Sequence, residues 1–237
     1  MGLTAIAPNL WTATQPLKFL GLEVGSRMTV VRLPKDELAI ISPIELTEGD
    51  RHHIEQLGTV AHIIAPNRFH YLSLRSTQSH YPQAQTWGVS GLSQKCPEVR
   101  IDHWLDQSSS LEEVLDYQPV HGVCSIMTSG VQPLQETVFL HRPSHTLILT
   151  DIAFNFDQFN SLGTRLAAQI LGSYNRLKPS RLEKWGSRDK TTIEACIRQI
   201  LAWDFDRVIP GHGSIVETGG KQQFKTGYEW FLGRSLS

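Results

Sequence analysis

Unbalanced charge, cysteine motifs and long apolar runs are all missing from this sequence of 237 residues. Its 22 basic and 23 acidic residues leave a formal net charge of -1. A chain with so little net charge has no long-range field that would draw it to nucleic acid or to an anionic membrane. We therefore expect neither among its partners, and the composition indicates no oligomeric state.

Cysteine is scarce, and Cys96, Cys124 and Cys196 form no C-x-x-C motif. An odd number of widely spaced cysteines excludes a disulfide framework and a zinc knuckle. All three are therefore predicted to be free thiols in the interior. Cys196 in particular falls on the apolar stripe of a predicted helix at 187–203.

No segment meets the requirements of a secretory signal or of a membrane span. Residues 1–15 lack a charged start followed by an apolar run of about 7 to 15 residues, and no stretch approaches about 18 apolar residues. We therefore expect a cytoplasmic protein. With 40% hydrophobic residues, the chain can bury a large core and is predicted to form one domain over residues 1–237.

The first part of the sequence has a clear order of strands and helices. Residues 28–42 are rich in β-branched side chains on both sides of a Pro-Lys-Asp-Glu turn, which predicts a hairpin. Thr47 is placed to cap a helix that Gly58 ends, and the apolar run 60–65 predicts the next strand. Strands therefore dominate the front of the chain.

The centre, at 75–118, is the least periodic segment and is interpreted as loops with a short helix or strand. After it the pattern predicts strands at 120–127, 137–141 and 146–150, a helix at 187–203, a strand at 207–209 and a final helix around 224–232. Helices thus alternate with strands at the back of the chain. This order favours a sandwich of two sheets covered by helices over a doubly wound sheet.

Polar residues follow three of these strands at their carboxyl ends, where ligands collect in α/β folds. They are Asn67 with His70, then Asp151, then His212. Two imidazoles and one carboxylate bind divalent transition metals and leave coordination positions open for water or substrate. His70, Asp151 and His212 are therefore the predicted metal ligands.

Taken singly, each of these residues also fits an ordinary structural role. Asn67 can cap a helix whose first turn holds His70, and Asp151 can cap a turn. His212 can lie by chance in the tight turn Pro-Gly-His-Gly. Glu136 precedes a predicted strand and could reach the site, but it is interpreted first as a solvated or salt-bridged glutamate. The residues alone leave both interpretations open.

In these segments the chain resembles the metallo-β-lactamase superfamily. There, a strand ends in a motif of the type His-x-His-x-Asp-His, and later come a Gly-His loop, a strand ending in Asp and a terminal Gly-His loop. Thr150-Asp151 and the Pro-Gly-His-Gly turn resemble the last two. Several further blocks between 27 and 209 are similar to a divergent, uncharacterised branch usually labelled a domain of unknown function. The resemblance implies an αββα sandwich of two mixed sheets flanked by helices, and metal-dependent hydrolysis.

The chain departs from the superfamily motif at most ligand positions. Pro66 and Arg68 occupy the places of the first two histidines, His70 that of the aspartate and Tyr71 that of the last histidine. Val131 stands where the middle Gly-His loop would supply its ligand. A two-metal mechanism needs about six protein donors, so the resemblance implies at most one metal ion here.

The first function left open is a hydrolase for an unknown small-molecule substrate, with one zinc ion at the three predicted ligands. Asp151 and Tyr71 are its predicted catalytic residues, Tyr71 as a proton donor to the leaving group. Asn67 and Arg68 are the predicted substrate-binding residues, because the permanent cation of Arg68 suits a negative substrate group.

Two other functions remain open. The chain is either a binding or assembly module that has kept the fold, binds no metal and uses its histidines as hydrogen-bonded loop supports, or it holds one iron ion for redox or oxygen chemistry at the same three residues. The cofactor is thus one zinc ion, one iron ion or none. Metal analysis separates the module from the enzymes, and an optical spectrum separates iron from zinc.

Overall fold

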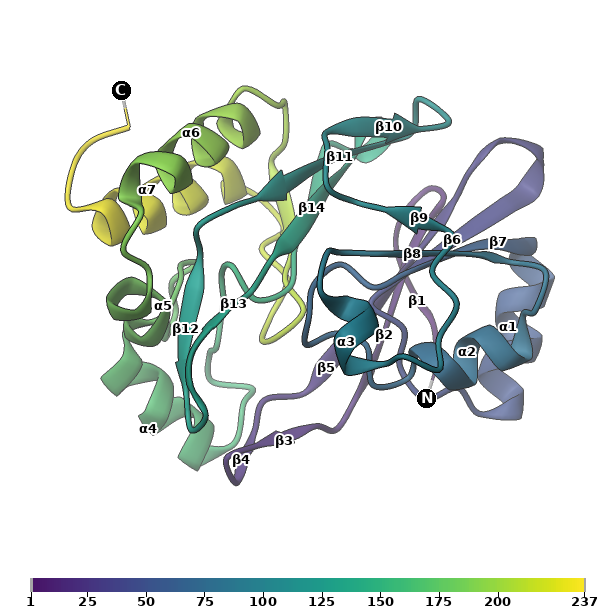
Figure 1. The fold of residues 1–237 in the computed structure, drawn as a ribbon, viewed down its shortest axis with the longest axis horizontal. Helices are drawn as coiled ribbons and strands as arrows, with labels where there is room; N and C mark the ends of the chain where they lie inside the picture. The colour runs from purple at the N-terminus through teal and green to yellow at the C-terminus, as the bar shows by residue number, and fades with distance from the viewer. Residues whose placement is uncertain (1, 237) are drawn as a thin grey trace.

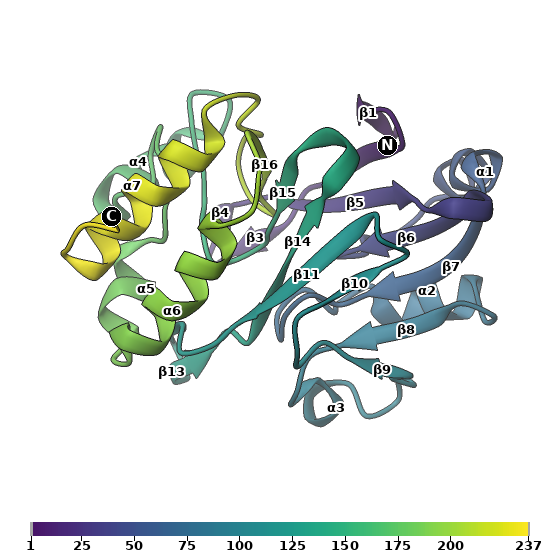
Figure 2. The same ribbon diagram turned by 90° about the horizontal axis from the view of Figure 1, so that it is seen from above.

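Two β-sheets face each other with helices on their outer sides in the computed structural model, which describes residues 2–236 (Figure 1). Helices α1, α2 and α3 cover the first sheet, and α6 and α7 cover the second (Figure 2). The predicted αββα sandwich is therefore confirmed. Met1 and Ser237, the ends of the predicted domain, lie outside the described residues.

The first sheet has the strand order β1-β2-β5-β6-β7-β8-β9. Its strands are β1 (Thr4–Ala7), β2 (Leu10–Gln15), β5 (Ser26–Arg32), β6 (Glu37–Ile41), β7 (Thr59–Ile64), β8 (Gln85–Gly88) and β9 (His103–Trp104). Pairs up to β5–β6 are antiparallel, whereas β6 to β9 run parallel. The sheet is therefore mixed, and β7 lies inside its parallel part.

The second sheet has the order β10-β11-β14-β15-β16, and only the β15–β16 pair is parallel. Its strands are β10 (Ser109–Leu111), β11 (Leu115–Val120), β14 (Glu136–His141), β15 (Thr146–Ile148) and β16 (Arg207–Ile209). Two ribbons stand apart from the sheets, β3 (Lys18–Phe19) with β4 (Leu22–Glu23), and β12 (Cys124–Met127) with β13 (Gly130–Pro133).

The helices are short and mostly connect the strands. They are α1 (Glu48–Leu57), α2 (Leu74–His80), α3 (Leu92–Lys95), α4 (Leu162–Leu171), α5 (Arg181–Gly186), α6 (Lys190–Leu201) and α7 (Gly220–Leu232). In the described part of the chain, no helix has the length and apolar character to cross a membrane.

Local signals in the sequence explain the elements that were predicted well. The Thr47 hydroxyl accepts a hydrogen bond from the backbone N–H of Asp50, whose carboxylate accepts one from the Thr47 N–H, so a capping box starts α1. Gly58 ends that helix, and β16 has the predicted bounds. These contacts lie within a few residues, so sequence alone reveals them.

Three apolar clusters hold the layers together. One lies between the sheets, where residues such as Ile41 and Ile64 of the first sheet meet Phe139 and Ile209 of the second. The other two lie under the outer helices. Cys196 belongs to the cluster under α6 and α7, as its position on the stripe predicted. The prediction of buried thiols is also correct for Cys96, whereas Cys124 is only partly buried.

Several predicted segments are wrong in detail. The segment at 75–118 holds more regular structure than predicted, since α3, the short strands β8 to β10 and parts of α2 and β11 alternate with its loops. The strand predicted at 120–127 is divided, since β11 ends where that range begins and the β12–β13 ribbon follows. The helix predicted from residue 187 starts at Lys190, because the Asp189 side chain accepts a hydrogen bond from Thr192 N–H and caps it.

Protonation of His141, at the end of β14, is expected to lower the stability of the folded protein in weak acid. Its side chain is fully buried, and burial lowers its pKa to about 4. In the unfolded chain the histidine pKa is near 6.5, so between about pH 6.5 and pH 4 the unfolded chain binds a proton that the folded chain does not bind. The free energy of unfolding is therefore at its full value above about pH 6.5 and falls towards pH 4. The loss reaches at most about 3 kcal/mol at the lower end. Urea unfolding at several pH values measures it.

The control is His141→Asn, which retains a side chain able to bond to the Ser144 hydroxyl, 2.6 Å from His141 Nδ1, but does not titrate. The difference in unfolding free energy between the two proteins should grow in favour of the variant as the pH falls. An unchanged difference between pH 7 and pH 4 would contradict the assignment of this acid sensitivity to His141.

Candidate metal centre

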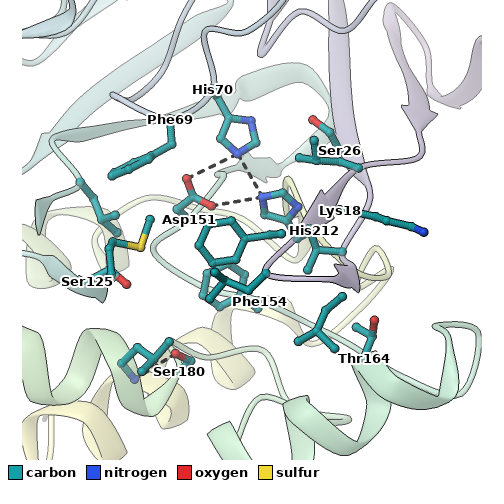
Figure 3. Close-up of a pocket in the computed structure, with 18 of the residues that line it drawn as sticks. Lys18, Ser26, Phe69, His70, Ser125, Asp151, Phe154, Thr164, Ser180 and His212 are labelled. Atoms are coloured by element: carbon teal, nitrogen blue, oxygen red, sulfur yellow. Dashed lines mark hydrogen bonds and ion pairs between the residues drawn. The ribbon is translucent and has the colours of Figure 1, made fainter. Parts of the chain in front are cut away.

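His70, Asp151 and His212 converge on one point at the edge of a cavity (Figure 3). His70 Nε2 lies 3.2 Å from His212 Nε2 and 3.5 Å from Asp151 Oδ2. His212 Nε2 lies 3.2 Å from Asp151 Oδ1. A tetrahedral ion with ligand bonds of about 2.0 to 2.1 Å separates its donors by about 3.3 Å. The three side chains therefore have the spacing of a metal site, and we call them the triad.

Asn67 shapes the loop that carries His70 after strand β7. Its side-chain Oδ1 accepts hydrogen bonds of 2.8 Å from the backbone N–H groups of Phe69 and His70. Such a turn is the ordinary capping role of asparagine. Here the turn aims the His70 ring back across the end of the sheet. Asn67 caps this turn and not a helix, because α2 starts only at Leu74, so the interpretation of Asn67 as a helix cap with His70 in the first helical turn is wrong.

Two glycines allow the His212 loop to pass close to the other ligand loops. A Cβ atom on Gly211 would lie 3.0 Å from His70 Cε1 and 3.1 Å from Thr150 Cα. Gly213 has φ +83°, and a Cβ there would lie 2.2 Å from the carbonyl oxygen of Asn155. The Pro-Gly-His-Gly sequence thus serves close packing around the histidine as well as the turn itself.

Arg27, on strand β5, ties this loop to the first sheet. Its guanidinium donates to the carbonyl of Pro210 and, at 2.7 Å, to the carbonyl of Gly213, on either side of His212. Burial lowers the pKa of Arg27 to about 10, which leaves it charged at neutral pH. The planar guanidinium can bond two carbonyls at once, so it fixes the loop more firmly than a lysine would.

The hydrogen bonds behind the two imidazoles orient them towards the shared point. His212 Nδ1 lies 2.6 Å from the carbonyl oxygen of Gly25. A carbonyl only accepts, so Nδ1 carries a proton and Nε2 is the nitrogen that faces Asp151 Oδ1, either as a donor to that carboxylate or with a lone pair for an ion. His70 Nδ1 lies 2.6 Å from the Ser42 hydroxyl, which can donate or accept. His70 Nε2 can therefore either share a proton with Asp151 or present a second lone pair to an ion.

Asp151 is fixed by two buried neighbours. Asn67 Nδ2 donates to Asp151 Oδ2 at 2.7 Å, to Glu136 Oε2 at 3.0 Å and to the Thr150 hydroxyl at 2.9 Å. The Glu136 carboxylate accepts the backbone N–H groups of Thr150 and Asp151 at 2.7 and 2.6 Å. Glu136 is only 1% exposed, so its interpretation as a solvated or salt-bridged glutamate is wrong, because the loop after β15 turns these amides onto it.

The charges of the triad depend on one another. Burial acts to raise the pKa of Asp151, but the imidazoles of His70 and His212 outweigh it and hold that pKa below its usual range. Burial acts to lower the pKa of His70, yet Asp151 raises it overall. Burial, with the Asp151 carboxylate beside it, raises the pKa of Glu136. Asp151 is thus held as a carboxylate, the form in which it can bind a metal ion.

The residues fit one metal ion and do not fit two. Two nitrogen donors and one carboxylate, oriented by second hydrogen bonds, form a three-ligand site whose open side faces the cavity. Val131, at the position of a further superfamily ligand, lies on β13 and is 55% exposed. Pro66, Arg68 and Tyr71 replace the histidines of the first motif, so the chain offers no second set of donors at those motif positions.

The remaining predicted site residues lie in different places. Tyr71 lines the cavity beside His70, in reach of a bound molecule. Arg68 does not line it, since its guanidinium lies 3.4 to 3.5 Å from the Cβ position of Gly91. Asn67 is fully buried behind the triad. The structure therefore brings together the three predicted ligands and Tyr71, with Asn67 supporting them and Arg68 turned elsewhere.

Lys95, at the end of α3, is a cavity residue that sequence reasoning missed. Its ammonium donates to the Arg68 carbonyl at 2.9 Å and lies 3.9 Å from the centre of the Phe69 ring. Burial, and then the Arg68 cation, lower its pKa. No motif marks Lys95 in the sequence, because the fold of the central segment places it beside the loop of His70.

The fold is that of the metallo-β-lactamases. DIM-1 metallo-β-lactamase exposed to ceftazidime is 15% identical with a TM-score of 0.63, and the match covers 96% of each chain. A metallo-β-lactamase from Pontibacter korlensis is 11% identical with a TM-score of 0.62, covering 98% of each chain. FIM-1 from Pseudomonas aeruginosa in the mono-zinc form is 14% identical with a TM-score of 0.56, covering 97% of this chain and 90% of that one.

At such low identity the structural matches define the fold alone. The chain belongs to the family described as domain of unknown function DUF4336, whose model matches residues 8–162. The resemblance to a divergent, uncharacterised branch of the superfamily is thereby confirmed. The matched segment contains His70 and Asp151 and ends before His212. No curated protein matches the sequence.

Proposed function

We propose that the chain is a metal-dependent hydrolase that holds one divalent ion at His70, Asp151 and His212. The observation that carries this proposal is the spacing of 3.2 to 3.5 Å among two imidazole nitrogens and a carboxylate at the edge of a cavity. The mono-zinc form of FIM-1 is an example of one ion on a similar fold. Zinc suits the donor set best, since it accepts nitrogen and oxygen ligands in tetrahedral geometry.

The ion would supply a Lewis acid and an activated water for attack on an ester, amide or phosphoester. The chain's own residues prepare that attack. Gly25 and Ser42 fix the imidazole orientations, Asn67 fixes the Asp151 carboxylate, and Glu136 holds the Asp151 backbone N–H. Each of these hydrogen bonds reduces the motion of a ligand, which strengthens metal binding.

Two side chains on the cavity wall are proposed to act on the substrate. The Tyr71 hydroxyl is the proton donor to the leaving group, because it lies on the wall beside His70. For a negative substrate group we propose Lys95 in place of Arg68. Lys95 lines the cavity and donates one N–H to the Arg68 carbonyl, which leaves its other N–H groups for a substrate. The Arg68 side chain does not line the cavity.

Metal analysis of protein purified without chelator tests the proposal. Expression with added zinc, and separately with added iron under anaerobic purification, should give about one ion per chain by elemental analysis, and an optical spectrum identifies iron. His212→Ala should lose the ion. His145→Ala, which removes an exposed histidine from another turn, is the matched control and should keep it. A metal content near zero under every supply would refute the proposal.

A non-catalytic binding or assembly module is the second candidate. It is favoured by the contacts that the triad already makes within the chain, since both imidazoles and Asp151 have hydrogen-bond partners without an ion. In that case His212→Ala lowers stability, and added zinc leaves the unfolding temperature of the parent protein unchanged. A zinc-dependent rise in that temperature excludes this alternative.

A further inference from the structure

The cavity beside the triad has a mostly apolar wall built from distant parts of the chain. Its volume is about 390 Å³, and the triad occupies one side while Thr164 and Ser180, on the helical side, lie across from it (Figure 3). The β3–β4 ribbon contributes apolar side chains, and α4 contributes Ala167, Ala168 and Leu171. The small alanines leave much of the space between α4 and the triad open.

Three polar side chains on the wall away from the triad, those of Ser125, Thr164 and Ser180, already have partners inside the protein. The Ser125 hydroxyl donates to Glu183 Oε1 at 2.6 Å, and the Thr164 hydroxyl donates to the Glu23 carbonyl at 2.9 Å. The Ser180 hydroxyl accepts from the Leu182 N–H at 3.1 Å. Because most of the lining is apolar, a sugar or nucleotide placed here would leave most of its own polar groups unpaired, which is costly. An aliphatic chain meets no such cost.

Contacts between the β3–β4 ribbon and α4 close one side of the cavity. Thr164 of α4 bonds to β4, and Leu22 of β4 lies 3.6 Å from the Cβ position of Gly163 on α4. The ribbon tip carries Phe19 and Leu20, which are 42% and 64% exposed. An apolar path therefore leads from the surface at the ribbon to the interior beside the triad.

We propose that this cavity binds the aliphatic chain of an amphiphilic substrate, an acyl ester or acyl amide whose polar head lies at the triad. The identity of the head and its hydrolysis rest on the proposed function, whereas binding of the chain does not. The wall from α4 and the β3–β4 ribbon holds the methylene groups, and Lys95 and Tyr71 lie at the polar end. The cavity therefore selects substrates by the length of their aliphatic chain.

Calorimetric titration of chelator-treated protein with straight-chain primary alcohols of increasing length tests this binding without metal chemistry. Each added methylene should tighten binding about fourfold until the cavity is full, after which the affinity stays level. Affinity that does not change with chain length would overturn the inference.

Two variants locate the bound chain. Ala167→Phe and Ala168→Leu add bulk from α4 into the cavity, and either should abolish the gain from longer alcohols while shorter ones still bind. Gln169→Phe adds similar bulk to an exposed position on the same helix and is the matched control. Circular dichroism verifies that each variant folds. Unchanged chain-length dependence in a folded Ala167→Phe protein would place the chain elsewhere and overturn the inference.

The results also separate this inference from the proposed function. If the parent protein binds the series as expected but takes up no metal, only the hydrolase proposal fails. If it takes up one ion and shows no chain-length dependence, only the present inference fails.

Discussion

Asp151→Asn is expected to lower the affinity for zinc by at least about 100-fold while the protein remains folded. Asparagine has the shape of aspartate, and its amide oxygen can still accept the 2.7 Å hydrogen bond from Asn67 Nδ2. It supplies no negative charge, however, so two imidazoles must hold a divalent cation without a neutralising ligand. Competition with a chromogenic chelator measures the change.

The thermal response gives a second measurement of the same substitution. For the parent protein, zinc at about 100 times its dissociation constant should add about 2.7 kcal/mol to the free energy of unfolding. The Asp151→Asn protein should show no such response. Asp157→Asn, six residues further along in the loop before α4, is the control and should respond as the parent does. Equal zinc stabilisation of both variants would show that Asp151 is not a ligand.

Glu136→Ala is expected to cost about 3 to 5 kcal/mol of stability, although Glu136 touches neither the cavity nor a metal position. Its carboxylate accepts the backbone N–H groups of Thr150 and Asp151 and the amide of Asn67, all of them buried. Removing the acceptor leaves these donors unsatisfied, at about 1 to 3 kcal/mol for each group that water does not reach. Urea unfolding measures the loss.

Glu136→Gln separates the acceptor role from the charge. Glutamine retains one oxygen acceptor and turns an NH₂ group towards the donors, so it should cost stability too, but less than alanine. Glu113→Ala, at an exposed glutamate in the turn between β10 and β11, should change stability by less than about 0.5 kcal/mol. A Glu136→Ala protein as stable as this control would mean that the Asp151 loop does not depend on Glu136.

The parts of the fold that sequence predicts are those with contacts between near neighbours. The capping box at Thr47 and the hairpin of β5 and β6 show this. Strands β1, β8 and β9 were not predicted, because they have four, four and two residues and too short a pattern to recognise. Their pairing is set by the sheet around them, which local propensity does not contain.

The candidate site likewise has a part that the sequence predicts and a part that it does not. The three candidate ligands follow strands, so their common location could be predicted from chain order and the resemblance. The groups that orient these side chains by hydrogen bonds could not be predicted. The Gly25 carbonyl bonds to a histidine 187 residues away, and the Ser42 hydroxyl to one 28 residues away. A backbone carbonyl and a single serine have no signature in the sequence, so only the folded chain reveals which of them orients a ligand.

The triad draws its members from both sheets. His70 follows β7 of the first sheet, whereas Asp151 and His212 follow β15 and β16 of the second, and the two histidines are 142 residues apart. An ion bound here would act as a removable cross-link between the halves of the molecule. Like a disulfide, it would restrict the unfolded chain by closing a long loop, yet a chelator could undo it without any change in redox state. Supply of metal would then govern how long this protein survives proteolysis.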